Sequence, residues 1–322
     1  MGTYVRTQSI DHAVGERGSV TLSVTSGDVR ARGIAGGDAH IRATFEISAT
    51  SDAEADRLFE EVQLRVERGS SELIATEPEW ATSVGSLIGR LLAARSHHEV
   101  SVVAEIPAGA QLRLTGVSSE MEVTGLRGEQ RYRTVSGDLM LSDVSGSVQL
   151  QTVSGDATIR GDQPLSAEVQ SVSGDLSVTA PTLRTLRANT VSGDVEFEGE
   201  LAATGDFRVE TVSGDLVVGL VGSATIEIHG ISTDVSSELD HRLEGQVDRR
   251  RLVIGAGGPR LRFNSMSGDV DVRRPRRVGK VEKTAEPVAP APDHATQLEV
   301  LRALERGEID VDEATRRLAG GA

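Results

Sequence analysis

The sequence Thr-Val-Ser-Gly-Asp at residues 134–138 returns along the middle of the chain at nearly constant spacing. Its glycines lie 18, 19, 19 and 21 residues apart, and a fixed period in this range is typical of proteins built from stacked repeats. Degenerate copies occur at 26–28, 118–120, 232–234 and 267–269. The five full glycine and aspartate pairs are Gly137 and Asp138, Gly155 and Asp156, Gly174 and Asp175, Gly193 and Asp194, and Gly214 and Asp215.

Apolar residues occupy equivalent positions on both sides of every copy. Around the second copy these are Val148 and Leu150 before the motif, and Ala157 and Ile159 after it. Such alternation is typical of strands with one buried face. Stacking the repeats about 4.8 Å apart pairs each strand with its copies and joins the apolar faces into one interior. We therefore predict an all-β fold, a β-solenoid resembling a parallel β-helix, with repeats of 18 to 21 residues.

The motif itself has the composition of a tight bend. Glycine adopts positive φ without a Cβ clash, and Asp and Ser side chains satisfy nearby backbone N–H groups. The extra residues of the longer repeats fall elsewhere, in 161–165, 180–184, 199–205 and 219–223. The motif therefore predicts a corner of constant shape, and the opposite corner is expected to vary.

The five motif aspartates are the most prominent candidate for a ligand site. In register they stand about 4.8 Å apart, where like charges repel by about 1 kcal/mol in water. Serine and backbone groups offset this repulsion in one interpretation, and a column of Ca²⁺ ions with oxygen ligands does so in the other. The pattern differs from that of calcium-binding β-roll repeats, so we expect a structural corner and no metal site.

Other catalytic and metal-binding patterns are weak. His97 and His98 are adjacent, and on a strand they would point to opposite faces, so a shared metal is not expected. The sequence has no Ser/His/Asp spacing, phosphate-binding glycine loop or His-Glu helix motif. Solenoid polysaccharide lyases use aromatic platforms, for which a chain with 2% aromatic residues has little material. We therefore expect no catalytic residues and no cofactor.

Charge and composition restrict the partners. A net charge of −15 disfavours nucleic acid and anionic lipid as partners of the repeats. The chain has no cysteine, which fits a reducing compartment. Residues 1–20 lack the apolar core of a signal peptide, and no stretch reaches the roughly 18 apolar residues that cross a bilayer. We expect a cytoplasmic protein without an integral membrane segment.

Composition divides the chain into four parts. The parts are a β-rich N-terminal cap with short helices at 1–110, the solenoid repeats at 111–273, a basic and then Pro/Ala-rich linker at 274–294, and a helical hairpin at 295–322.

Within the repeats the regular period is interrupted near 236–266. Strands around 252–254 and 261–263 flank a turn rich in Gly there, and this pattern predicts a hairpin that closes the end of the stack.

The N-terminal part carries helix and hairpin signals between its strands. Ser51 and Glu54 form a capping box before residues with helical apolar spacing. Strands around 64–66 and 73–75 predict a β-hairpin. A second short helix is expected within 80–95, where it would cover the open edge of the first repeat.

The C-terminal segment is the candidate partner-binding element. About 25 residues have too little core to be stable alone, so we expect this hairpin to dock on a second copy or on an unknown protein partner. Its apolar positions are Leu298, Leu301 and Leu304 in the first helix, and Ile309 and Leu318 around the second. A preceding arginine cluster offers at most weak peripheral contact with anionic headgroups, and consists of Arg273, Arg274, Arg276 and Arg277.

The repeated Val-Ser-Gly-Asp phrases, over roughly residues 10–273, resemble the bacterial β-strand repeat family called the toast-rack or "putative adhesin" domain. Residues 298–318 look like the short helical SHOCT-type modules that often accompany such repeats. The resemblance implies a non-enzymatic repeat domain, often found with bacterial envelope-stress and membrane-associated regulators.

Three functional hypotheses follow. The first is a non-catalytic scaffold or sensor that acts through protein–protein interaction. The second is an exported, adhesin-like surface protein, and the third is a carbohydrate-active β-helix enzyme. Regular repeats, missing catalytic patterns and the amphipathic tail favour the first hypothesis.

Overall fold

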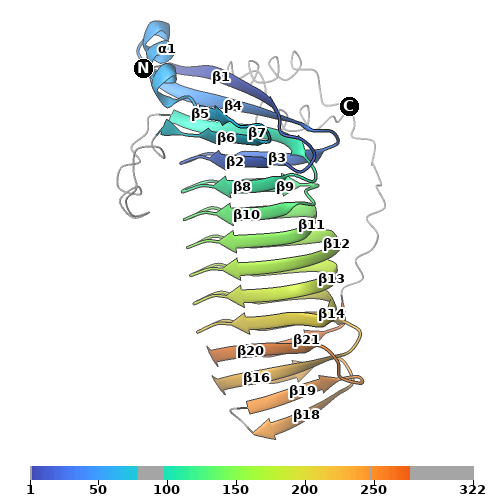
Figure 1. Cartoon of the computed structure of the whole chain (residues 1–322). Coiled ribbons are helices and arrows are strands. Elements are labelled where there is room, and N and C mark those ends of the chain that lie inside the picture. The colour runs from blue at the N-terminus through green and yellow to red at the C-terminus, as the bar shows by residue number, and fades with distance from the viewer. Residues whose placement is uncertain (1, 79–97, 247–248, 276–322) are drawn as a thin grey trace, which may run out of the picture. The chain divides into compact units, whose positions relative to one another are not determined.

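The computed structural model of the protein describes residues 2–78, 98–246 and 249–275. These residues form a ladder of strands, β1 to β21, stacked along one axis (Figure 1). The predicted all-β, solenoid-like fold is confirmed for this part of the chain. The predicted second N-terminal helix, at 80–95, and the predicted C-terminal hairpin, at 295–322, lie outside the described residues.

Four long parallel strands make the regular centre of the stack. Leu139 lies beside Ala157, Ala157 beside Leu176, and Leu176 beside Val195. Each strand runs from one motif corner, around the opposite side, to the next motif corner. The register shifts midway, where the extra residues of the longer repeats are accommodated. The strands are β11 (Leu139–Gln151), β12 (Ala157–Gln170), β13 (Leu176–Asn189) and β14 (Val195–Glu210).

The core is a narrow apolar interior between the two faces of each bent strand. Residues before the corner, such as Leu150 and Val169, and residues after it, such as Leu141 and Ile159, are all buried. Aliphatic side chains fill most of the interior, and Phe197, Phe207 and Phe263 are buried in its C-terminal half. Continuous stacking explains how repeats too small for a core of their own become stable.

One polar pair interrupts this interior. Gln130 lies in register between Leu112 and Val148, and it is fully buried. Its amide donates to the backbone carbonyl of Ser145 at 3.0 Å, and its side-chain oxygen accepts from the hydroxyl of Tyr132 at 3.0 Å. Burial raises the pKa of Tyr132. Because both polar groups find partners, the pair is tolerated in the core.

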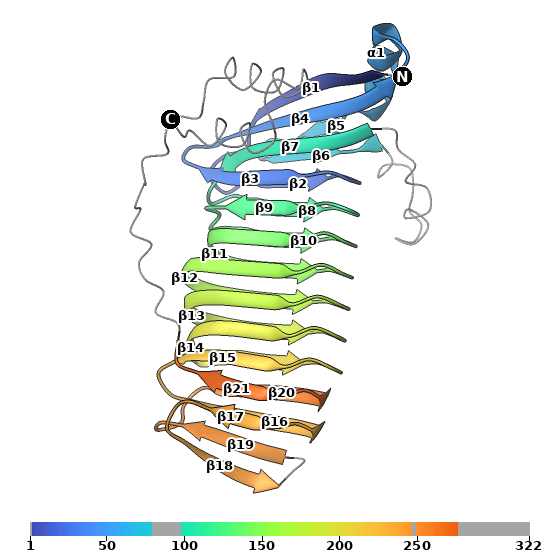
Figure 2. The same cartoon turned by 180° about the vertical axis from the view of Figure 1, so that it is seen from behind.

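Antiparallel strands close the N-terminal end. β1 (Gly2–Ala13) pairs with β4 (Asp38–Ala49), and β4 pairs with β7 (His98–Pro107) (Figure 2). Next to them, β5 (Arg65–Arg68) and β6 (Glu72–Thr76) form the predicted hairpin. The first parallel rungs follow as β2 (Ser19–Ser23), β3 (Val29–Ile34), β8 (Gln111–Thr115), β9 (Met121–Thr124) and β10 (Glu129–Arg133).

The predicted N-terminal helix is α1 (Asp52–Val62), and it begins at Ser51, whose hydroxyl accepts the backbone N–H of Glu54. The Glu54 carboxylate bonds the backbone N–H of Thr50, one residue before the capping-box position. Phe59 of the helix packs edge-to-face on Phe45 of β4, with ring centroids 5.4 Å apart. Among the described residues no helix is long and apolar enough to cross a membrane.

The C-terminal end differs from the predicted hairpin. β18 (His241–Gln246) and β19 (Arg249–Ile254) form the antiparallel hairpin, and β19 pairs with β16 (Ala224–Ser232). β20 (Arg260–Ser267), which was expected to pair with residues 252–254, instead lies parallel between β14 and β16. Its continuation β21 (Val270–Arg273) lies between β15 (Leu216–Val221) and β17 (Val235–Ser237).

The last repeat in the chain is therefore not the last in space. The copy at 267–269 is inserted between the copies at 213–215 and 232–234 (Figure 2). The inserted segment matches its neighbours: Phe263 lies between Val209 and Ile228, and Val272 beside Val218, with both inserted side chains buried. Burial of these apolar side chains explains why the chain leaves space for one rung between the copies at 213–215 and 232–234 and later fills that space with the copy at 267–269.

Replacement of Phe263 by alanine tests this insertion. Because Phe263 is buried inside the stack, the variant is expected to lose about 3–5 kcal/mol of unfolding free energy in urea titrations. The control Met266→Ala changes an exposed side chain of the same strand and should cost at most about 0.5 kcal/mol. Equal losses for the two variants would contradict the insertion.

Candidate interaction surfaces at the repeat corner

The motif glycines form a single file along the stack. All five have positive φ, from 107° at Gly137 to 156° at Gly214. A Cβ on Gly174 would lie 2.2 Å from the carbonyl oxygen of Gly155, and a Cβ on Gly193 would lie 2.2 Å from that of Gly174. Glycine is therefore required at each corner for two reasons: its backbone has positive φ, and the neighbouring repeat lies too close to leave room for a Cβ.

The motif aspartates form a hydrogen-bonded ladder beside this file. The Oδ1 of each aspartate accepts the backbone N–H of the aspartate in the next rung. For example, Asp138 accepts from Asp156 at 2.9 Å, and Asp156 accepts from Asp175 at 2.8 Å. The ladder continues through Asp194 and Asp215 to the inserted copy and ends at the copy after it, with bonds of 2.7–2.8 Å. Charge-assisted bonds to backbone donors offset the repulsion between stacked carboxylates.

Hydroxyl groups complete the corner. In four copies the first motif residue donates to the carbonyl oxygen two residues later, as Thr152 does to Ser154 at 3.0 Å. At the N-terminal side, the hydroxyls of Ser118 and Ser136 lie 2.9 Å apart. These bonds keep the bend the same in successive rungs and hold the exposed side chains in equivalent positions.

The motif valines are the residues that sequence reasoning missed. Val153, Val172, Val191 and Val212 are each nearly half exposed, at 44–49%. Their equivalents in the last two rungs, Met266 and Ile231, are more exposed still, at 58% and 74%. The sequence does show an apolar residue in each bend. Its exposure could not be predicted, because the alternation of buried and exposed side chains along a strand does not continue through a bend.

No group of three or more His, Cys, Asp or Glu side chains in the described part of the chain is arranged to hold a metal ion. His98 opens β7, and His97 lies outside the described residues. The stacked aspartates use their Oδ1 atoms on backbone N–H groups, as shown by the bond from Asp175 to Asp156.

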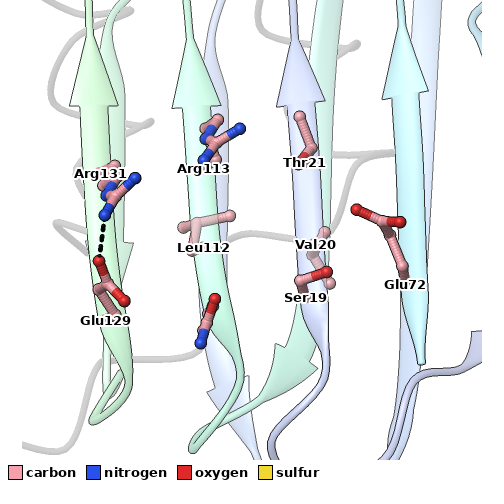
Figure 3. Close-up of a pocket in the computed structure, with 9 residues that line it drawn as sticks. Ser19, Val20, Thr21, Glu72, Leu112, Arg113, Glu129 and Arg131 are labelled. Carbon is pink, nitrogen blue, oxygen red and sulfur yellow. Dashed lines mark hydrogen bonds and ion pairs between the residues drawn. The ribbon is translucent and has the colours of Figure 1, made fainter.

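Described residues line at least two shallow depressions on the strand faces. The first, of about 160 Å³, crosses four neighbouring strands near the N-terminal end (Figure 3). Its charged rim includes Arg113 and the ion pair of Arg131 with Glu129 at 2.6 Å, and Val20 and Leu112 belong to the apolar core beneath it.

The second depression, of about 370 Å³, lies at the C-terminal end beside an arginine cluster. Glu227, one of the residues that line it, is mostly buried, and three guanidinium groups lie 3.6–3.9 Å from its carboxylate oxygens. The three arginines are Arg251, Arg260 and Arg262. This arrangement joins β16, β19 and β20 electrostatically and supports the inserted rung.

The arginines at the exit of the repeats are only partly described. Arg273 pairs with Asp271, and this hydrogen bond raises the pKa of Arg273. The pKa of Asp271 is lowered, first by the hydroxyl of Ser236 and then by Arg273. The backbone N–H of Arg274 bonds Glu238, and Arg276 and Arg277 lie outside the described residues. Arg273 is thus engaged with the acidic surface of the repeats.

The fold and the repeated corner define the class of this protein, a solenoid-like stack of parallel β-strands with one constant corner. The Toastrack DUF4097 family matches residues 38–273. The chain belongs to this family, which confirms the resemblance noted from its repeats. Residues 298–318, which were predicted to be SHOCT-like, lie beyond the matched residues and outside those described.

Solved structures that match this chain share little sequence with it and have low TM-scores. A "putative cell adhesion protein" from Clostridium sporogenes is 12% identical, with 85% of this chain and 100% of that chain covered and a TM-score of 0.28. A "putative adhesin" from Bacteroides fragilis is 11% identical, with 83% and 97% covered and a TM-score of 0.33. A "putative lipid binding protein" from Parabacteroides distasonis is 8% identical, with 83% and 96% covered and a TM-score of 0.25. A search of curated proteins finds no match.

The glycine file makes a specific prediction about stability. Gly174→Ala combines positive φ with a clash against backbone, so we expect a loss of more than about 3 kcal/mol of unfolding free energy. Gly36 has a similar φ of 105° but open space around its missing Cβ, so Gly36→Ala should cost about 1–2 kcal/mol. Chemical denaturation compares the two, and equal losses would argue against close stacking of the corners.

The aspartate ladder predicts different effects for two substitutions at one position. Asp175→Ala removes the acceptor for the Asp194 N–H and should cost about 1–2 kcal/mol. Asp175→Asn keeps an acceptor oxygen and removes one charge from the column, so its stability should stay within about 0.5 kcal/mol of the wild type. Thermal or urea denaturation measures both, and a larger loss for asparagine than for alanine would refute the ladder.

Proposed function

We propose that this protein is a non-catalytic β-repeat scaffold or sensor that acts through protein–protein interaction. The observation that carries the proposal is the regular corner, which presents the same exposed side chains at nearly constant spacing along the stack. Parallel strands hydrogen-bonded on both sides hold these positions rigidly, so a partner meets an ordered surface. Such a surface supports binding at a low entropic cost.

The polar depressions support a binding role more than a catalytic one. The N-terminal depression is open and lined by Ser19, Glu72 and Arg113 among others, and Glu129 and Arg131 neutralise each other on its rim. In the C-terminal cluster Arg251, Arg260 and Arg262 all pair with the single carboxylate of Glu227, so the cluster keeps an excess of positive charge. Catalytic sites usually lie in enclosed and largely apolar pockets, whereas these depressions are open and lined by charged side chains, so we propose that the protein is not an enzyme.

The finer parts of the proposal rest on the sequence. The amphipathic positions Leu298, Leu301, Leu304, Ile309 and Leu318 support a SHOCT-like helical hairpin that recruits a partner or self-associates. The absence of cysteine supports a cytoplasmic location. The resemblance to toast-rack proteins supports a role in envelope-stress or membrane-associated regulation. Cell fractionation tests the location, and recovery of the protein at the cell surface would overturn it.

Co-purification tests the proposed function directly. The full chain and a chain ending at residue 294 are tagged and isolated from the native host, and their partners and molar masses are compared. We expect the full chain to retain a protein partner or a higher mass that the shortened chain loses. Unchanged partners and mass would remove the C-terminal segment from the mechanism, and a full chain without any protein partner would refute the scaffold proposal.

A further inference from the structure

An exposed apolar column runs along the motif corner across six neighbouring rungs. We call it the corner stripe. It consists of Val153, Val172, Val191, Val212, Met266 and Ile231, which are 44–74% exposed. Isolated exposed apolar side chains are common on protein surfaces, but a contiguous row of them marks an interaction site.

The pairing of the strands shows that these residues are true neighbours. Ser173 bridges to Ser192, Ser192 to Ser213, and Ser213 to Ser267, each one residue beyond a member of the stripe. At the C-terminal end Ser232 pairs with Ser267, so Ile231 lies beside Met266. The stripe therefore repeats about every 4.8 Å and extends over about 24 Å.

A column of carboxylates borders the stripe. Three residues after each stripe member lies an exposed aspartate, and none of the ion pairs among the described residues involves these aspartates. Their hydrogen bonds to backbone N–H groups leave the charge of each carboxylate in place. The bordering residues are Asp156, Asp175, Asp194, Asp215, Asp269 and Asp234.

Charge and length together indicate what this surface accepts. An apolar row beside a negative column is complementary to a helix with an apolar stripe bordered on one side by Lys or Arg. At 1.5 Å per residue, a helix that matches about 24 Å has about 16 residues. We propose that the corner stripe is the docking site for a basic amphipathic helix of a protein partner, and this inference rests on the proposed scaffold function.

A second copy of this chain fits the stripe less well. Pairing two stripes would bring two columns of aspartates together, and each copy carries a net charge of −15. Like charges brought together at an interface oppose binding. Self-association through this surface is therefore an outcome that the experiment must detect, as is coverage by residues 276–322.

Binding of a defined peptide to the full chain tests the proposal. The probe is a fluorescent 16-residue helix with a leucine stripe bordered by lysine, and a matched probe carries glutamate in place of lysine. Fluorescence anisotropy should show binding of the lysine probe, weakened by added salt. The glutamate probe should not bind.

Two pairs of substitutions at apolar side chains of similar exposure distinguish binding at the corner stripe from non-specific hydrophobic binding, and a third pair tests the bordering aspartates. Val172→Ser with Val191→Ser should weaken binding of the lysine probe by at least about tenfold. Val103→Ser with Met140→Ser removes equally exposed apolar side chains, each 48% exposed, from outside the stripe and should leave binding unchanged. Asp175→Asn with Asp194→Asn keeps a side-chain oxygen that accepts the backbone N–H of the next rung, and should weaken binding while reducing its salt dependence.

Three results would overturn the proposal. Equal effects of the stripe and control pairs would show non-specific binding. A smaller molar mass of the stripe variant in light scattering would identify a second copy as the occupant. Absence of probe binding to the wild type, with faster proteolysis of residues 276–322 in the stripe variant, would identify the chain's own C-terminal segment.

Different results would refute the docking site and the scaffold function. If the stripe variant retains every partner found with the wild-type chain, the docking site is wrong and the scaffold function stands. If the wild-type chain has no protein partner at all, the scaffold function is wrong, whatever the peptide does.

Discussion

The close approach of successive corners is the constraint on which this structure depends. The carbonyl oxygen of Gly155 lies where the next corner would place a Cβ, and the same holds for Gly174 beneath Gly193. Only glycine permits this approach together with positive φ. Once the corners are in contact, the strands on both sides fall into register, and their apolar residues merge into a core that no single repeat could form.

The same contact converts a column of like charges into a stabilising ladder. Each aspartate receives a backbone N–H from the neighbouring rung, as Asp194 does from Asp215 at 2.8 Å. Each motif residue therefore has its own place in the corner: glycine allows the stacking, aspartate links the rungs, and the valine before the bend remains exposed, where we propose that a partner docks. A fixed corner and a variable opposite side fit a protein whose surface, rather than a cleft, makes the contacts.

The residues that stack on one another in the regular repeats could be predicted from the sequence, because the motif recurs at short and nearly constant intervals. Leu139, Ala157 and Leu176 could be aligned by counting from the motif, and the structure pairs them. The order of the last rungs could not be predicted in this way, because Ile231 follows Val212 at the ordinary interval of 19 residues. That order is determined by the burial of Phe263 and Val272 between strands that are distant in the sequence, and the spacing of the motif does not reveal this contact. Equally, the core position of Gln130 depends on a partner, Tyr132, that strand periodicity does not reveal.

Disulfide trapping tests the stacking of the corners most directly, because the native chain contains no cysteine. Cysteine pairs are placed at residues 212 and 266, 266 and 231, and 212 and 231, and oxidised under native conditions. Neighbouring rungs, about 4.8 Å apart, allow a disulfide, whereas residues two rungs apart, at about 9.6 Å, do not. We predict that the first two pairs are bridged and the third is not. Efficient bridging of 212 with 231, without bridging of 212 with 266, would contradict this order of the rungs.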